Sequence, residues 1–388
     1  MNRFRILTVL GARPQIIKAS ALNRAIHHSF SSQLEEIILH TGQHYDTEMS
    51  GQFFQEMGID EPKYNLQVGS GSHAKQTASM LTGIEEVVLK ENPDALLVYG
   101  DTNSTLAGAL VAAKLHIPVI HVEAGLRSFN KAMPEEINRI TCDHLSTLLF
   151  TPTIAGLENL KREGFKLHDD LRPSASHPRI YHCGDVMYDN SLHFSEVASH
   201  DSGMLLRLGL SADAYVLCTI HRAENTDHPS HLKGIFEALL MIADVKKQVI
   251  VLPLHPRTRK MLVDAIGKEL LERVQSHSNI HLIDPVGFID MIALESNASM
   301  VITDSGGVQK EAYFFKKPCV ILRDQTEWVE LVENGNALLA GHQTERILAC
   351  FDRFMAKSSH SFPRGRRHVE RESLSLDTNW VVELSKTQ

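Results

Sequence analysis

Hydrophobic residues along this chain of 388 residues fall into short continuous runs, separated by longer stretches in which apolar positions recur at helical spacing. A continuous apolar run bounded by turn residues predicts a strand that is buried on both faces of a parallel sheet. The amphipathic stretches between the runs, such as 76–89 and 232–243, predict helices. The predicted strands span residues 5–10, 36–40, 95–99, 119–122, 148–151, 181–183, 215–220, 248–252, 280–282, 300–303 and 319–322.

A polar segment, residues 164–179, interrupts this alternation and carries Pro173 and Pro178, which is typical of a linker between domains. The sequence therefore predicts an α/β chain of two doubly wound, Rossmann-like domains that face each other across a cleft. The first spans residues 1–172 and the second residues 173–364, and we expect residues 365–388 to pack back on the first domain. Sheets of this kind bind ligands at the carboxyl ends of their strands.

The composition narrows the class of protein. Hydrophobic residues make up 43% and charged residues 22%, as in an ordinary globular protein. The 39 basic and 47 acidic side chains are dispersed and balance at −8, so nucleic acid is not an expected partner. No apolar run approaches the roughly 18 residues that span a bilayer, so no membrane partner is expected. Five cysteines without a CxxC pair indicate a reducing compartment, and we expect a cytoplasmic protein.

The first predicted strand ends in a glycine turn that opens a helix. Gly11 makes the turn, Pro14 suits the first helical position, and Arg13 and Lys18 add positive charge. The free amide groups at the start of a helix, together with these cations, predict a phosphate site. A tight turn with two exposed basic side chains explains the same residues equally well.

The other signals for a cofactor or a metal are weak. The segment 69–74, GSGSHA, fits a loose dinucleotide fingerprint, but it does not follow the first strand and no well-placed ribose-binding acid follows it. Chance explains this match better than a dinucleotide site does. The sequence also lacks HExxH, a Cys/His cluster and an Asp-rich calcium loop. We therefore expect neither a cofactor nor a metal.

Four acidic residues follow strands or open a helix in the first half. Asp101 and Glu123 stand at the carboxyl ends of two near-continuous apolar strands, where an acid without a function is costly. The alternatives are a helix cap for Asp101 and an ion pair with Arg127 for Glu123. Glu135 and Glu136 follow a proline at a helix start, where the helix dipole explains one of the two. Neighbouring carboxylates with different pKa values can supply an acid and a base.

In the second half, two strand ends carry candidates for anion binding. The strand 215–220 ends in His221 and Arg222, although a lone histidine at a strand end is more often structural. The strand 300–303 leads to a Ser-Gly-Gly turn, and glycine there lets the backbone approach a diphosphate closely. Glu311, about one helical turn later, is placed to accept hydrogen bonds from ribose hydroxyls. A plain glycine turn with Glu311 on a solvated face is the weaker alternative.

Taken together, these segments resemble the non-hydrolysing UDP-N-acetylglucosamine 2-epimerases along essentially the whole chain. The resemblance rests on the motifs GARPQIIK, GDTNSTLA, HVEAGLRS, PEEINR, HRAEN and TDSGGVQKEA, in the order of the family. It implies the two-domain GT-B fold and a homodimer. It also implies epimerisation at C2 of a UDP-2-acetamido sugar, of the UDP-GlcNAc to UDP-ManNAc type, for surface polysaccharide precursors. The family eliminates UDP in the anti sense to a 2-acetamidoglucal and adds it back, without a cofactor.

The resemblance also assigns roles by position. The implied catalytic residues are Asp101, Glu123, Glu135 and His221. The three acids transfer the C2 proton in an order that stays open, and His221 stabilises the diphosphate. The implied diphosphate ligands are Arg13, Lys18, Ser305, Gly306 and Gly307, and the implied ribose ligand is Glu311.

The chain departs from the best-known members at positions that concern the sugar. Ala223 and Trp328 replace arginines of the HRRE and TERPE patterns, and these variants resemble the branch that acts on UDP-2,3-diacetamido-2,3-dideoxyglucuronic acid. The segment 43–46, QHYD, differs from the QHR pattern linked to activation by substrate, so the resemblance does not imply allosteric activation here.

Two other classes of protein have the same two-domain layout. A GT-B glycosyltransferase would form a new glycosidic bond and need an acceptor pocket, whereas the clustered acids of the first domain favour epimerisation. A nucleotide-sugar sensor would bind without turnover and would have no need of Asp101, Glu123 and His221. An NAD-dependent epimerase fits least, because the only dinucleotide fingerprint is misplaced.

Overall fold

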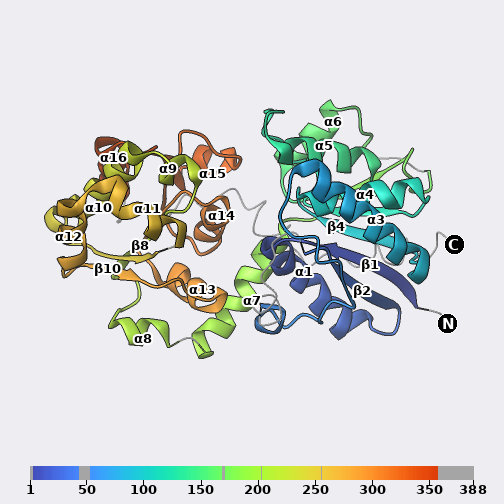
Figure 1. The fold of residues 1–388 in the computed structure, drawn as a ribbon, viewed down its shortest axis with the longest axis horizontal. Helices are drawn as coiled ribbons and strands as arrows, with labels where there is room; N and C mark the ends of the chain where they lie inside the picture. Colours follow the sequence, from blue (N-terminus) through green and yellow to red (C-terminus); the bar gives the residue numbers. More distant parts are fainter. Residues whose placement is uncertain (1–2, 43–52, 168–170, 202, 255, 357–388) are drawn as a thin grey trace. The chain divides into compact units, whose positions relative to one another are not determined.

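The computed structural model describes residues 3–42, 53–167, 171–201, 203–254 and 256–356. The chain divides into two compact units, and among the described residues those up to Asn190 form the first and those from Ser191 form the second (Figure 1). The segments 43–46 and 365–388, which entered the sequence predictions, lie outside the described residues. Each unit is described below by itself.

The first unit is built on a parallel sheet of seven strands in the order β3-β2-β1-β4-β5-β6-β7. Its strands are continuous apolar runs: Leu7 pairs with Ile37 on one side and Leu96 on the other, and all three are buried. The order places β1 inside the sheet, as expected for a doubly wound fold. The strands are β1 (Phe4–Leu10), β2 (Leu34–His40), β3 (Tyr64–Asn65), β4 (Ala95–Tyr99), β5 (Val119–Val122), β6 (Leu148–Thr151) and β7 (Arg179–His182).

Helices connect these strands, and three of them, α3, α4 and α5, pack side by side (Figure 1). Hydroxyl side chains start several of the helices: Ser72, Thr102 and Thr153 each accept a hydrogen bond from a backbone N–H of the first turn. The helices of this unit are α1 (Arg13–Ala25), which a π-helical turn (Ile26–Phe30) extends, α3 (His73–Glu91), α4 (Asn103–Lys114), α5 (Pro134–Leu145), α6 (Ile154–Arg162) and the first residues of α7 (Val186–Asp201).

The second unit has a parallel sheet of six strands in the order β10-β9-β8-β11-β12-β13. Its core lies between the sheet and helices such as α10, whose Leu232, Ile235 and Phe236 are fully buried. The strands are β8 (Tyr215–Thr219), β9 (Val249–Pro253), β10 (Ile280–Ile283), β11 (Met300–Thr303), β12 (Cys319–Ile321) and β13 (Ala337–Leu339). The helices are α8 (Met204–Leu208), α9 (Ala223–Thr226), α10 (Pro229–Val245), α11 (Pro256–Ile266), α12 (Lys268–Ser276), α13 (Phe288–Asn297), α14 (Gly306–Phe314), α15 (Val329–Glu333) and α16 (Thr344–Ala356).

The structure differs from the predicted strands at β7, and it adds two short strands, β3 and β13. The strand predicted at 181–183 was assigned to the second domain, but β7 pairs with β6 of the first sheet, with Tyr181 opposite Phe150. The unit boundary therefore falls between Asn190 and Ser191, inside α7, and not between residues 172 and 173. The strand β13 was not predicted, because three residues are too few to show a hydrophobic period.

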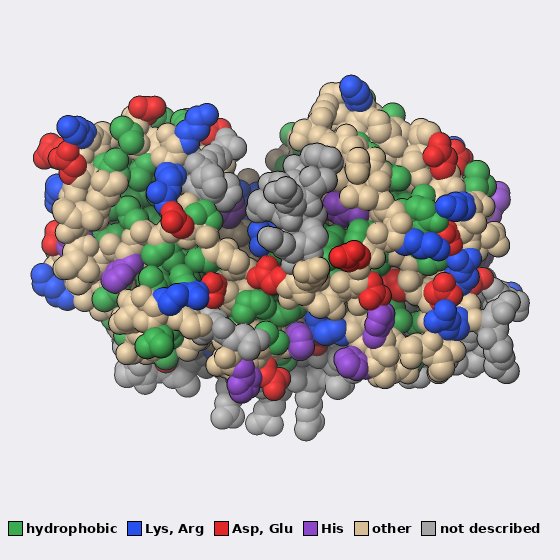
Figure 2. All heavy atoms as spheres, turned by 60° about the horizontal axis from the view of Figure 1, so that its bottom comes forward, with side chains coloured by type: hydrophobic (Ala, Val, Ile, Leu, Met, Phe, Trp, Pro, Cys, Tyr) green, Lys and Arg blue, Asp and Glu red, His purple; other side chains and the backbone are tan. Residues whose placement is uncertain are grey.

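The surface and the cysteines agree with an ordinary globular protein. Figure 2 shows basic and acidic side chains interspersed on the face that it presents. All five cysteines are free thiols, and Cys142, Cys218 and Cys319 are buried. Among the helices that the structure describes, none combines the length and the apolar character that crossing a bilayer requires.

We predict that Tyr99→Phe leaves the stability unchanged or raises it by up to about 1 kcal/mol. Tyr99 is fully buried, and its hydroxyl has no hydrogen-bond partner among the described residues. Tyr215 is the matched control, because it is equally buried but its hydroxyl donates to the carbonyl oxygen of Leu294 at 2.6 Å. Tyr215→Phe should cost about 1 kcal/mol. Urea unfolding measures both changes, and an equal loss in the two variants would contradict the prediction.

Candidate active site

The candidate residues of the first unit come from the carboxyl ends of neighbouring strands. The strands β1, β4 and β5 are adjacent in the sheet, and they lead to Lys18, Asp101 and Glu123 respectively. Lys18 Nζ forms an ion pair with Glu123 Oε2. Both atoms lie close to the backbone of Gly100, since a Cβ atom at that residue would be 3.2 Å from each. The topology thus brings a cation and two of the predicted acids to one end of the sheet.

The backbone at Glu123 has an unusual conformation. Its φ of +79° lies in the left-handed region, which costs energy for a residue with a side chain. Gly125 also has a positive φ, of +81°, and a Cβ atom there would clash with the carbonyl oxygen of Gly156. Such a turn persists only where the surrounding structure holds it. The strained backbone therefore supports the hypothesis that the Glu123 carboxylate has a function.

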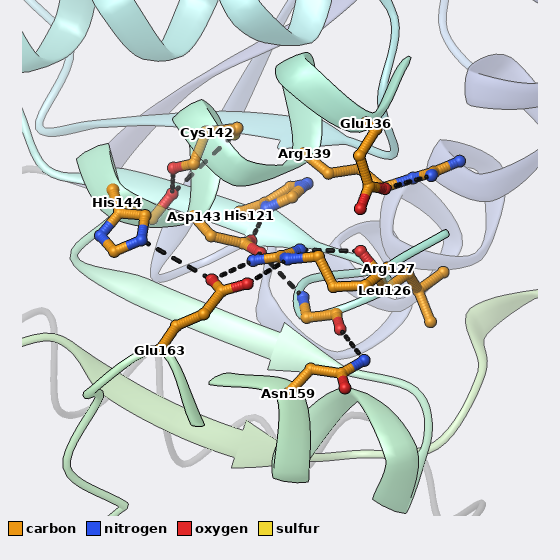
Figure 3. A network of polar contacts seen from close by, with 12 residues as sticks. His121, Leu126, Arg127, Glu136, Arg139, Cys142, Asp143, His144, Asn159 and Glu163 are labelled. Atoms are coloured by element: carbon orange, nitrogen blue, oxygen red, sulfur yellow. Dashed lines mark hydrogen bonds and ion pairs between the residues drawn. The ribbon is translucent and has the colours of Figure 1, made fainter. Parts of the chain in front are cut away.

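The carboxylate of Asp143, on α5, holds this turn (Figure 3). Its Oδ2 accepts a hydrogen bond from the backbone N–H of Gly125 at 3.0 Å and pairs with Arg127 at 2.7 Å. Its Oδ1 lies 2.7 Å from Nδ1 of His121, whose Nε2 lies 2.8 Å from the carbonyl oxygen of Gly100. One buried acid thus connects the turn that carries Glu123 with the turn that precedes Asp101.

This network consists of buried charges. Burial opposes the charged form of His121, but Cys142 and Asp143 outweigh it and raise the pKa of His121 well above its usual range. Burial likewise opposes the ionised form of Asp143, but His121 and Arg127 lower the pKa of Asp143 below its ordinary value. His121 is therefore an imidazolium that donates from both ring nitrogens, to Asp143 and to Gly100.

The alternative that sequence reasoning raised for Glu123, a pair with Arg127, is wrong. Arg127 binds Asp143, and its Nε and Nη2 atoms also donate to the carboxylate of Glu163, each at 2.7 Å. The pKa of Arg127 is raised, because these two acids outweigh the effect of its burial. Glu123 is paired with Lys18 instead.

The two consecutive glutamates at the start of α5 have different surroundings. Glu136 is buried and accepts hydrogen bonds from the backbone N–H groups of Ser128 and Phe129 at 2.9 Å each. Burial alone would raise the pKa of Glu136, but these bonds and Arg139 lower it. Glu135 is exposed. Glu136 thus has a structural role, which leaves Glu135 as the candidate for chemistry.

Asp101 is oriented by the same helix. Its Oδ2 accepts a hydrogen bond from Arg139 at 2.5 Å, and the side-chain amide of Asn138 donates to its carbonyl oxygen at 2.9 Å. Arg139 also pairs with Glu136 at 2.9 Å, so it links the structural acid to the candidate catalytic acid. The helix cap of α4 is Thr102, not Asp101. Capping therefore does not explain Asp101.

A small pocket adjoins Glu123, and sequence reasoning did not identify its other acids. Its lining includes Glu123, Phe150, Cys183, Asp185 and Asp189. Burial, together with the nearby charge of Asp185, raises the pKa of Asp189 to about 6, although Arg24 opposes this. The only sequence signal was the position of Asp185, which follows β7 as the other candidates follow their strands.

The last candidate of the first unit, Arg13, opens α1. It is exposed, and its guanidinium lies 4.2 Å from the centre of the Phe53 ring. The side-chain amide oxygen of Gln15 accepts hydrogen bonds from the N–H groups of Gly11 and Ala12, at 2.9 and 3.0 Å. Two amides of the predicted phosphate turn are thus already bonded, so the basic side chains carry the prediction of anion binding there.

In the second unit, the carboxylate of Asp304 organises the candidate residues. Asp304 follows β11, is fully buried, and accepts hydrogen bonds from the backbone N–H groups of His221 and Arg222 at 3.1 and 3.0 Å. Asn225 donates to it at 3.0 Å, and Nδ1 of His221 lies 3.5 Å away. Because β8 and β11 are neighbours, one acid fixes the turn that presents His221.

The predicted Ser-Gly-Gly turn is the start of α14. Ser305 caps the helix and accepts from the N–H of Val308 at 3.4 Å. A Cβ atom at Gly306 would overlap Glu327, whereas the nearest atom to one at Gly307 would be the Ser305 hydroxyl, 3.9 Å away. The space at Gly307, the helix dipole and the backbone amides suit an anion. Glu311 lies buried in the same helix.

The predicted residues thus form one group in each unit. Lys18, Asp101 and Glu123 gather in the first, with Glu135 on the adjoining helix, and His221 and residues 305–307 gather around Asp304 in the second. Trp328, which marks a departure from the family pattern, packs its ring 4.1 Å from Nζ of Lys310. Among the described residues, no group of three or more His, Cys, Asp or Glu could hold a metal ion.

We predict that Asp143→Asn destabilises the first unit by about 3 kcal/mol, the scale for breaking a buried ion pair. All three partners of Asp143 donate hydrogen bonds, and an amide offers them one oxygen and an opposing NH₂ group. Thermal unfolding measures the change. The control is Asp60→Asn at an exposed acid, which should stay within about 0.5 kcal/mol. Equal stability of the two variants would show that the network is dispensable.

Comparison with known proteins identifies the family. The family described as UDP-N-acetylglucosamine 2-epimerase matches residues 27–369. A UDP-N-acetylglucosamine 2-epimerase homolog from Methanococcus maripaludis is 48% identical over 370 residues, which is 94% of this chain and 98% of that protein. The UDP-2,3-diacetamido-2,3-dideoxy-D-glucuronate 2-epimerase of Pseudomonas aeruginosa is 50% identical over 344 residues, covering 89% of this chain and 90% of that protein.

A solved structure agrees with these sequence matches. The crystal structure of Methanocaldococcus jannaschii UDP-GlcNAc 2-epimerase in complex with UDP-GlcNAc and UDP has a TM-score of 0.80 and 40% identity, and it covers 99% of this chain and 100% of that one. The resemblance read from the motifs and the GT-B fold class are both confirmed. The chain is an isomerase that belongs to the UDP-N-acetylglucosamine 2-epimerase family.

Proposed function

We propose that this epimerase inverts C2 of a UDP-linked 2-acetamido sugar, of the UDP-GlcNAc to UDP-ManNAc type. The observation that carries the proposal is the Lys18–Glu123 ion pair beside Gly100, directly before Asp101. One cation and two acids thus come from the carboxyl ends of β1, β4 and β5. The names of the relatives support the substrate class, because each is an epimerase that acts on a UDP-sugar.

The reaction begins with an elimination. A base takes the C2 proton, the C2–H electron pair forms the C1=C2 bond of a 2-acetamidoglucal, and the C1–O bond breaks so that UDP leaves with its electron pair. In the return step UDP bonds to C1 again, and a proton is added to the opposite face of C2. This chemistry needs proton-transfer groups around C2 and positive charge near the diphosphate.

Asp101, Glu123 and Glu135 are the proposed proton-transfer groups. Lys18 forms an ion pair with the carboxylate of Glu123, and Arg139 forms one with the carboxylate of Asp101 at 2.5 Å. An ionised carboxylate can accept a proton. Glu135 is exposed at the start of α5, and none of the residues that the structure describes forms an ion pair with it. We leave the order of the three acids open.

The second unit supplies the nucleotide site in this proposal. His221 stabilises the leaving diphosphate, and Asp304 orients it through the backbone bonds at the end of β8. The helix start at Ser305, Gly306 and Gly307 binds phosphate in this proposal, and phosphate binding is also the role proposed for Arg13 and Lys18 of the first unit. Glu311 accepts the ribose hydroxyls. Support for these roles comes from the position of each residue at a strand end or a helix start.

A second sugar, UDP-2,3-diacetamido-2,3-dideoxyglucuronic acid, is the alternative substrate. The Pseudomonas aeruginosa relative of that name is 50% identical to this chain. The structure adds that Trp328 is largely buried against Lys310, so it does not stand in for the charged arginine of the other members. In either case the product is a precursor for surface polysaccharide. The chemistry at C1 and C2 is the same for both sugars.

Proton NMR in deuterated water tests this proposal and separates the two sugars. The protein is incubated with UDP-N-acetylglucosamine and, in parallel, with the 2,3-diacetamido glucuronate analogue, without added NAD or metal. We expect deuterium at C2 and a manno product from one of them. Binding of UDP with no exchange in either sugar would contradict epimerisation and favour a sensor. Transfer to an added acceptor would favour a glycosyltransferase.

We predict that Asp101→Asn and Glu123→Gln lower kcat by roughly 10²- to 10⁴-fold, the usual contribution of a general acid or base. UDP binding should be retained, because each change keeps the shape of the side chain. The control is Glu85→Gln at an exposed position of α3, which should keep full turnover. Steady-state kinetics and UDP titration measure the effects. Full activity in either variant would remove that acid from the mechanism.

A further inference from the structure

A second buried acid lies next to Glu311, and the proposed reaction does not use it. Glu295, on α13, is only 1% exposed. No donor among the described residues forms a hydrogen bond with either of its carboxyl oxygens. Its carboxyl group instead meets that of Glu311, which is 7% exposed, on the neighbouring helix α14. Two carboxyl groups thus share one buried site.

Among the described residues, the other titratable groups near Glu295 do not supply a proton or a positive charge to it. Tyr215, on β8, donates its hydroxyl to the carbonyl oxygen of Leu294 at 2.6 Å. Cys319, on β12, is buried, and this burial raises the pKa of its thiol. Lys310, next to Glu311 in α14, places its ammonium group over the Trp328 ring. The donor in the carboxyl pair must therefore be one of the two acids.

Electrostatics requires the pair to hold a proton. Two adjacent carboxylates away from water repel each other, and each would also lose its hydration. Burial first and the charge of Glu311 second raise the pKa of Glu295 well above its usual range. Glu295 is therefore the protonated member near neutral pH. A carboxylic acid O–H can donate one hydrogen bond to an adjacent carboxylate.

We propose that Glu295 is a positioning residue for the nucleotide, whose O–H donates to Glu311 and holds that carboxylate as the acceptor for the ribose hydroxyls. The inference rests on the proposed function, which assigns the ribose to Glu311. The carboxyl pair of Glu295 and Glu311 therefore holds one proton, and the nucleotide binds tightly only while the pair is singly protonated.

The inference predicts an alkaline loss of affinity for UDP. As the pH rises through the titration of the pair, the shared proton leaves and Glu311 loses the hydrogen bond that Glu295 donates. A second negative charge also appears in the nucleotide-binding unit, near an anionic ligand. The dissociation constant should then rise by up to about tenfold per pH unit, the limit for one linked proton. At lower pH the pair holds its proton and the affinity stays constant on this account.

The test is calorimetric titration of UDP into the full chain across the neutral and alkaline range. Three substitutions are compared with the wild type: Glu295→Gln, Glu295→Leu and, as a control on the exposed face of α12, Glu269→Gln. The amide of the first variant donates at every pH, so its affinity should stay close to the wild-type neutral value with no alkaline loss. The second variant has no donor and should bind several-fold more weakly at every pH. The control should follow the wild type.

The dissociation constant of each variant is divided by that of the wild type at the same pH, which removes the effect of the titration of UDP itself. Thermal unfolding confirms that all four proteins are folded. An alkaline loss that persists in Glu295→Gln, or equal affinities of the Gln and Leu variants, would overturn the inference while leaving the proposed function intact. A wild-type protein that does not bind UDP would overturn both.

Discussion

The carboxylate of Asp143 holds together the end of the first sheet that carries the candidate catalytic acids. It receives donors from His121, Gly125 and Arg127, and His121 in turn holds the carbonyl oxygen of Gly100. The turns after β4 and β5 therefore share one buried anchor. Without it, the left-handed conformation of Glu123 would have little to maintain it, because that conformation is unfavourable for a residue with a side chain.

The second unit also contains a buried carboxylate that fixes a turn after a strand. Asp304 is fully buried and receives the backbone N–H groups of His221 and Arg222, so the turn after β8 is fixed by an acid that follows β11. Glu136 does this for the loop at Ser128 in the first unit. In each case a buried, fully bonded carboxylate orients a segment, and a more exposed side chain nearby is available for chemistry. Burial and complete hydrogen bonding thus distinguish the structural acids from the candidate catalytic acids.

Much of this could be predicted from the sequence, for a physical reason. Strands buried on both faces are continuous apolar runs, so the residue after each run lies at the carboxyl end of a strand, and Asp101, Glu123, His221 and Ser305 were found in this way. The partners of these residues were not predictable. Asp143 is 22 positions away from His121, and nothing local distinguishes it from a solvated acid on α5. Arg127 has a nearby acid in sequence but binds distant ones.

The sequence also does not show which sheet a strand belongs to. Hydrophobic periodicity locates a strand but does not choose its partner, so β7 was found at almost the right residues and assigned to the wrong sheet. Glu295 illustrates the same limit for chemistry. It lies in an apolar stretch with no motif around it, and its importance appears only when α13 and α14 bring it to Glu311.

The proposed reaction breaks the C1–O bond between the sugar and UDP and then forms it again. Positional isotope exchange tests this most directly. The substrate carries oxygen-18 in that bond, and phosphorus NMR follows its position during turnover. If UDP leaves and returns, the label moves into the non-bridging positions of the β-phosphate as C2 exchanges its proton. Exchange at C2 with the label fixed in the bridge would contradict elimination of UDP.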